Sequence, residues 1–231
     1  MTVFALEAPP AHTLEHLLID QALPRLLAGQ GHLIVHASVA SIQTRTALFL
    51  GSSGWGKSTM AGLLHRRGHQ VFSDDCALLN PRNSRTLVTP AYPGLRLYED
   101  SIEQAFPVPP ITNAVSDYSN KQRVIGLTTP INLSGPQRLD AIYVLSNPAL
   151  TNGDATIRAM TPATACMALL EHGFRLDPTA HDESVRMLRQ AAAVAKATPA
   201  YSLTYPHDFS QQDRLIDLLS THLEGVVKEP T

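Results

Sequence analysis

The chain begins with a segment whose apolar side chains recur at helical spacing. In residues 13–29 leucines stand three or four positions apart, and Thr13 is placed to act as the N-cap of a helix. Proline lacks the backbone N–H that a helix interior needs, so we expect Pro24 to divide this stretch into two short helices. The pattern predicts a helical N-terminal segment over residues 1–30.

After residue 30 the apolar residues no longer recur at helical spacing. They form short runs on either side of a glycine-rich segment. The runs are aliphatic and β-branched, which is typical of strands. A strand, a glycine-rich loop, a helix and a further strand within about 30 residues are the crossover signature of α/β folds. The segments are strands over 32–40, 46–50 and 69–79, a loop over 51–56, and a helix that begins near Lys57 and ends at Gly68.

The second half continues this alternation and adds one long connection. Residues 107–121 hold three prolines and several small polar residues, and we predict a mobile loop that closes over the site as a lid. No repeat interrupts the pattern, so we expect a single domain over residues 1–231. The remaining predicted elements are strands 87–90, 94–98, 140–145, 155–160 and 200–205, and helices 99–106, 162–173, 178–197 and 209–223.

Composition narrows the class of protein. Hydrophobic residues make up 44% and charged residues 16% of the 231, which is too apolar for a disordered chain. The 18 Lys and Arg against 20 Asp and Glu leave a net charge of -2, so no basic surface predicts a nucleic-acid partner. Two cysteines cannot form a disulfide framework or a structural zinc site. No signal peptide and no apolar run of about 20 residues is present, so we expect a cytoplasmic protein without a membrane partner.

Residues 51–58 match the phosphate-loop pattern G-x-x-x-x-G-K-[ST] in full. Glycines let successive N–H groups point at phosphate oxygens, and the helix that follows adds its positive N-terminal end. Lys57 is placed for the β- and γ-phosphates and Ser58 for Mg²⁺, so the cofactors we expect are ATP and Mg²⁺. Trp55 either packs over the nucleotide or covers an apolar edge. The predicted nucleotide-binding residues are Gly51, Ser52, Ser53, Gly54, Trp55, Gly56, Lys57, Ser58 and Thr59.

A pair of carboxylates, Asp74 and Asp75, ends the strand that follows the loop helix. A phosphate loop needs a carboxylate for Mg²⁺ or for the nucleophile. Asp75 comes only 18 residues after Lys57, much sooner than the acidic residue of transport or motor ATPases. Neighbouring side chains on an extended chain point to opposite faces, so the two acids are expected to face different ways. The alternative is a solvated acidic turn.

Taken together, these motifs resemble the catalytic domain of HPr kinase/phosphorylase, and more closely its short stand-alone relatives. The resemblance rests on the run from the phosphate loop through R-G-H to S-D-D, and it extends over residues 14–223. It is also carried by LPRLLAGQGHLIVHAS, which includes His36, by PAYPGLRL, which includes Arg96, and by DAIYVLS. It implies a P-loop kinase domain of the HPr kinase/PEP carboxykinase-like type, an α/β fold with a central mixed sheet and flanking helices.

The resemblance also implies roles for particular residues. Lys57 and Ser58 would hold phosphates and Mg²⁺. Asp74 would be the catalytic carboxylate that takes the proton of the attacking hydroxyl, and Asp75 its metal-side neighbour, although the order of these two roles stays open. His36 would match the active-site histidine, and Arg96 the arginine after the acidic pair.

The function implied is an ATP-dependent kinase whose phosphoacceptor is a serine of a peptide or protein. Thr59 replaces a glutamate of the bifunctional enzyme, its N-terminal domain has no counterpart, and only Lys121 and Arg123 stand for its basic loop. These departures favour the kinases of lasso-peptide gene clusters over an enzyme that acts on HPr. Hexamers occur in the resembled family, so a homo-oligomer is compatible with it. The alternatives are a regulatory ATPase without an acceptor, or an ABC-type subunit, suggested by LSGPQ at 133–137.

Overall fold

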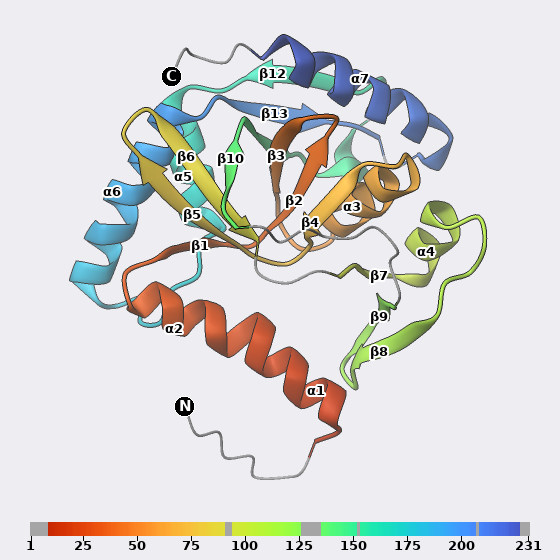
Figure 1. Ribbon diagram of the computed structural model, residues 1–231, viewed down its shortest axis with the longest axis horizontal. Coiled ribbons are helices and arrows are strands. Elements are labelled where there is room, and N and C mark those ends of the chain that lie inside the picture. Colours follow the sequence, from red (N-terminus) through yellow and green to blue (C-terminus); the bar gives the residue numbers. More distant parts are fainter. Residues whose placement is uncertain (1–8, 91–93, 126–134, 152, 207, 227–231) are drawn as a thin grey trace.

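A six-stranded mixed sheet forms the centre of the protein (Figure 1). The computed structural model describes residues 9–90, 94–125, 135–151, 153–206 and 208–226. The three inner strands β3, β11 and β13 run parallel, and β2, β4 and β12 pair antiparallel at the two sides. The expected α/β fold with a central mixed sheet is therefore confirmed. In spatial order the strands are β12 (Thr156–Ala159), β13 (Ala200–Thr204), β11 (Ala141–Leu145), β3 (Arg45–Leu50), β2 (Ala37–Ile42) and β4 (Gln70–Ser73).

Helices cover both faces of this sheet because its central strand is apolar on both sides. Phe49 of β3 belongs to the cluster of buried side chains on the face of α3 (Lys57–Arg66) and α7 (Gln212–Gly225). Its neighbours Leu48 and Leu50 belong to the cluster on the other face, with α5 (Pro162–Glu171) and α6 (His181–Ala197). Alternation along an extended chain produces this division. The phosphate loop therefore follows a strand that is buried on both faces of the sheet.

A second, antiparallel sheet lies beside the first and continues directly from the acidic pair. Its order is β1 (Leu33–Val35), β5 (Ala77–Arg82), β6 (Arg85–Pro90) and β10 (Gln137–Leu139). The sequence predicts one strand over 32–40 and one over 69–79, whereas the chain divides each into two strands that belong to different sheets. The breaks fall at His36 and at residues 74–76, so the candidate site lies where the chain passes between the sheets.

The segment predicted as a loop over 107–121 is largely a β-hairpin. Strands β8 (Thr112–Ser116) and β9 (Ser119–Val124) pair antiparallel, and β9 also pairs with β7 (Arg96–Leu97), next to helix α4 (Glu99–Ala105). The loop prediction is wrong from Thr112 onward. The prolines end at residue 110, and the buried side chains of Val115 and Val124 give the following residues an apolar anchor. Closure of this segment over a ligand stays a prediction.

The N-terminal segment is one helical run, in contrast to the two separate helices that Pro24 suggests. Helix α1 (Ala11–His16), a π-helical turn η1 (Leu17–Ala22) and α2 (Leu23–Gly29) follow without a break (Figure 1). Pro24 directly follows the π-helical turn, and the helical run continues past it. The run begins after Pro10, and the predicted cap, Thr13, is buried and accepts a hydrogen bond from the backbone N–H of Asp117 on the hairpin instead.

Within the described residues, no helix combines the length and the apolar character that crossing a membrane would require.

We expect the central core to depend strongly on Phe49, which is fully buried and stacks on Tyr143 at a centroid distance of 5.5 Å. Phe49→Ala should lower the free energy of unfolding by about 3–5 kcal/mol, because it removes buried area and leaves a cavity. Urea denaturation measures the change. Leu188→Ala, at an exposed position on α6, is the control and should change stability by less than about 0.5 kcal/mol. Equal stability of the two variants would contradict this packing.

Candidate functional site

The phosphate loop has the strand, loop and helix context that its sequence pattern requires. It leaves the carboxyl end of β3 after Leu50 and enters α3 at Lys57. Gly54 and Gly56 have φ values of 82° and 92°, in the left-handed region that favours glycine. A Cβ atom at Gly56 would lie 2.3 Å from the Tyr205 hydroxyl, which donates a hydrogen bond to the Trp55 carbonyl at 2.8 Å. The loop conformation therefore requires glycine at this position.

Lys57 is buried in the loop, and its ammonium group donates to the carbonyls of Gly51 at 2.7 Å and Ser52 at 3.2 Å. A second ammonium group, that of Lys121 on β9, lies 3.4 Å from the Ser58 hydroxyl. Burial and the charge of Lys121 lower the pKa of Lys57 to about 8. Two cations beside the N-terminus of α3 form a positive region that an anion would stabilise. The donor set thus fits the phosphates of a nucleotide.

The other predicted loop residues lie around this region. The Trp55 side chain is half-buried, and its backbone carbonyl accepts a hydrogen bond from the Tyr205 hydroxyl. The Thr59 hydroxyl lies 2.9 Å from that of Ser101 on α4, which ties the loop helix to the segment after β7. The described residues hold no cluster of three or more His, Cys, Asp or Glu side chains suited to a metal. A Mg²⁺ ion bound mainly by phosphates and water needs only one or two protein ligands. Ser58 lines the loop cavity and Asp75 the groove, and their role as metal ligands stays a prediction.

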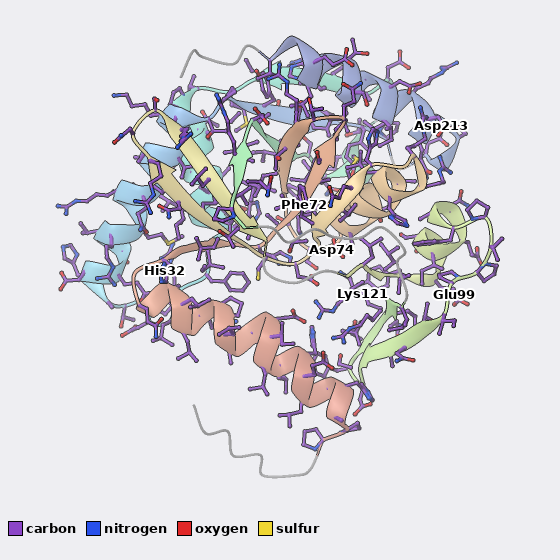
Figure 2. All side chains as sticks on the ribbon, viewed as in Figure 1. His32, Phe72, Asp74, Glu99, Lys121 and Asp213 are labelled. Carbon is purple, nitrogen blue, oxygen red and sulfur yellow. The ribbon has the colours of Figure 1, made fainter. Side chains whose placement is uncertain are left out.

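Two cavities adjoin the phosphate loop and share part of their lining. The first, the loop cavity, lies over Gly56, Lys57 and Ser58 and has apolar walls that include Leu63, Leu97, Ala155 and Leu215. The second, the groove, lies between the N-terminal helix, the hairpin and residues 170–178, and Asp75 lines it. Asp74 at the end of β4 and Lys121 on the hairpin are labelled in Figure 2. The lining residues common to both cavities are His36, Ser53, Tyr98 and Lys121.

The two carboxylates of the acidic pair have different surroundings. Asp74 is buried, and its oxygens accept hydrogen bonds from the Ser38 hydroxyl at 2.9 Å and the Arg96 backbone N–H at 3.0 Å. Burial and the neighbouring Asp75 raise the pKa of Asp74 to about 6. Asp75 contacts the Arg96 guanidinium. Burial acts to raise the pKa of Asp75, but Arg96 and Lys121 outweigh it and hold that pKa below its usual value.

One carboxylate of the pair is open to the groove, and the other has the higher pKa. Asp75 lines the groove, whereas both oxygens of Asp74 are bonded inside the protein. Residues 74 and 75 lie in a bend after the end of β4, so the alternation expected of an extended chain does not account for this difference. The acidic pair is not a solvated turn, because Asp74 is buried and Asp75 half-buried. Which carboxylate serves as the base stays a prediction.

His36 lies at the break between β1 and β2, next to the acidic pair. Its Nδ1 lies 2.7 Å from the backbone carbonyl of Asp75, and a carbonyl only accepts, so Nδ1 carries the proton. Burial, together with the nearby Lys57, lowers the pKa of His36 to about 4. The ring is therefore neutral at physiological pH, and its Nε2 can accept a hydrogen bond. His36 thus lines both cavities as a neutral group.

Arg96 links the acidic pair to a residue that the sequence does not single out. Its guanidinium is buried, and Nη1 contacts both Asp75 and, at 2.9 Å, Asp20 on the N-terminal helix. Two further residues of the site were not predicted from the sequence: Ser38, the donor to Asp74, and Tyr205, the neighbour of Gly56. Ser38 lies two residues after His36, so the sequence pattern around His36 could have indicated it. Asp20 gives no such signal, because an acid on a helix usually faces water.

Comparison with known proteins leaves the family unassigned. No family model matches the sequence, and no curated protein matches it. Among solved structures, the HPr(Ser) kinase/phosphatase from Coxiella burnetii aligns with 82% of this chain and 95% of its own, at 14% sequence identity and a TM-score of 0.46. The HPr kinase assignment therefore stays a resemblance.

We expect His36 to titrate near pH 4 in the Mg²⁺-free protein. The folded state keeps the ring neutral where an unfolded chain, with a pKa of 6.5, is already protonated. As the pH falls from 6.5 toward 4, His36 should therefore lower the stability of the fold. NMR of the imidazole protons, assigned by their loss in His36→Gln, measures the midpoint. A midpoint at or above 6.5 would contradict the burial of this ring.

Proposed function

We propose that this protein is a kinase that transfers the γ-phosphoryl group of ATP to an alcohol, a serine hydroxyl of a peptide or protein. One observation carries the proposal: the phosphate loop adjoins both a loop cavity and a groove, and a carboxylate lines the groove. Phosphoryl transfer requires the phosphates and the attacking hydroxyl to be held in line, with positive charge around the transferred group.

The donor side is supported by the charges of the loop cavity. The phosphates would be held by Lys57, Ser58 and the N-terminus of α3. The apolar walls of the cavity would pack against the adenine ring of the nucleotide. Bound Mg²⁺ would supply neutralisation of phosphate charge, with Ser58 and Asp75 as its protein ligands. Lys121 borders both cavities and would bring a second positive charge close to the group in transfer.

The acceptor side is supported by the groove. Most of its lining comes from the N-terminal helix, the hairpin and residues 170–178, and Tyr118 at the hairpin turn is exposed at its border. Such a groove suits a peptide strand better than a small molecule. Two observations favour different carboxylates as the general base. Asp75 lines the groove and could meet the acceptor hydroxyl, whereas Asp74 has the higher pKa. Given the sequence resemblance, lasso-type precursor peptides are the first acceptors to test, ahead of HPr.

The competing function is a regulatory ATPase without an acceptor, and the groove argues against it because a nucleotide switch needs no second cavity beside its carboxylates. The LSGPQ motif that suggests an ABC-type subunit begins at residue 133, and its first two residues lie outside the described part of the chain. Incubation with Mg²⁺ and ATP, with and without candidate peptides, separates the functions. A kinase adds a phosphoryl group to a peptide, and a regulatory ATPase only releases phosphate.

We expect Lys57→Ala to lower phosphoryl transfer by several orders of magnitude, because it removes the positive charge inside the phosphate loop. The fold should persist, since the lysine donates to loop carbonyls and contributes little to the core. Mass spectrometry of the peptide product measures transfer, and thermal melting checks the fold. Lys196→Ala, at an exposed position on α6, should retain full transfer. Near-normal transfer by folded Lys57→Ala would overturn the proposed role of the loop.

Asp74→Asn and Asp75→Asn should fail in different ways. Loss of the general base should lower kcat by about 10²–10⁴-fold while nucleotide affinity is kept. Loss of the metal-side carboxylate should instead shift the Mg²⁺ concentration needed for half-maximal rate. Steady-state kinetics over a Mg²⁺ series assigns the two roles. The same loss of Mg²⁺ response in both variants would mean that neither acid is the base.

A further inference from the structure

The N-terminal helix reaches the candidate site through a buried ion pair. Asp20 is buried, and one of its oxygens lies 2.9 Å from Nη1 of Arg96, the same atom that contacts Asp75. Its second oxygen contacts Nδ1 of His16, one helical turn earlier. A short chain of contacts therefore runs from the helix to Asp75, one of the acids that line the groove. Its members are His16, Asp20, Arg96 and Asp75.

A contribution to the stability of the fold does not explain why the Asp20 carboxylate is buried. Removing a carboxylate and a guanidinium from water costs several kcal/mol per ion, and well-packed apolar residues are often as stable or more stable in the same place. Burial raises the pKa of Asp20 to about 6, although Arg96 and His16 oppose the rise. The same helix leaves Leu17 and Leu23 39% and 45% exposed. The helix therefore buries this charged side chain although two of its leucines remain exposed to water.

The backbone around Asp20 is also unusual. Asp20 lies in the π-helical turn Leu17–Ala22, where the N–H of Leu23 donates to the carbonyl of Leu18. A π-turn adds a residue to the helical repeat and often occurs at functional sites. The wider turn changes which residues of the helix face the interior. Asp20 contacts Arg96 and also lines the groove, together with Gln21 and Arg25 of the same helix.

We propose that Asp20 is a positioning residue for phosphoryl transfer, acting through Arg96 to hold the Asp75 carboxylate toward the groove. The inference rests on the proposed kinase function. With Asp20 on one side, the Arg96 guanidinium is fixed between two carboxylates, and Asp75 keeps one orientation. His16 fixes Asp20 in turn. Because the same helix borders the groove, seating of an acceptor peptide and orientation of Asp75 are mechanically linked.

The first test is Asp20→Asn, which keeps the shape of the side chain and removes its charge. We expect kcat for peptide phosphorylation to fall by about 10- to 100-fold, as misplacement of a reacting group does. The KM for ATP should stay within about twofold, because the phosphate loop is untouched. Glu15→Gln is the matched control. Glu15 lies on the same helix and pairs with Arg123 at 2.8 Å in a more exposed position, and its loss should leave kcat unchanged.

The second test asks whether Asp20 acts through Arg96. If it does, the double variant Asp20→Asn/Arg96→Gln should have the kcat of Arg96→Gln alone. Independent structural damage would instead multiply the two losses. Melting temperatures of all variants identify any loss of fold. If Asp20→Asn does not fold, His16→Gln serves as the second variant, with kcat expected to fall by about threefold at unchanged KM for ATP.

The outcomes separate the two proposals. If the wild-type protein phosphorylates no peptide, the proposed function fails and this inference fails with it. If the wild type is active, wild-type kcat in folded Asp20→Asn or, in its place, folded His16→Gln overturns the inference alone. Multiplied losses in the double variant, or a KM for ATP that rises in proportion to the loss of kcat, also overturn it.

Discussion

The arrangement of the site depends on the charge of one buried arginine. Arg96 gives its backbone N–H to Asp74 and its guanidinium to Asp75 and Asp20, so three carboxylates meet around one residue. Without that cation, the three acids would lie close together in a region of low dielectric, which is strongly unfavourable. Arg96 begins β7, so it also joins the small third sheet and the N-terminal helix to the end of β4.

The phosphate loop provides positive charge on the other side of the residues that line both cavities, opposite the carboxylates around Arg96. Lys57 and Lys121 lie close enough to repel each other, which contributes to the lowered pKa of Lys57. Phosphate oxygens placed between them would replace repulsion with attraction on both sides. The site is thus divided into a positive half, which suits the phosphates, and a half rich in carboxylates, which suits a hydroxyl that must lose its proton. His36, neutral and fixed by a backbone carbonyl, lies between the two halves without adding charge to either.

Local patterns in the sequence were sufficient for the parts of the site that are contiguous in the chain. The strand, glycine loop and helix around Lys57 follow from periodicity and one motif, and the acidic pair from its place after apolar residues. The ion pair between Asp20 and Arg96 joins residues 76 positions apart, and no local pattern indicates it. The π-turn escapes notice because helical periodicity does not reveal one extra residue. The hairpin was missed because its buried apolar side chains, Val115 and Val124, are few and prolines directly precede it.

The position of β2 has a consequence for what could vary in this protein. β2 runs antiparallel between β3 and β4, so the phosphate loop and the acidic pair leave strands that are not neighbours. Adjacent strands are about 4.8 Å apart, which places the two departure points roughly 10 Å from each other. β2 carries Ser38, the partner of Asp74, and His36 immediately precedes it. The distance between the phosphate loop and the acidic pair is therefore set by the width of one strand. Insertions in the surrounding loops could reshape the groove and leave that separation unchanged.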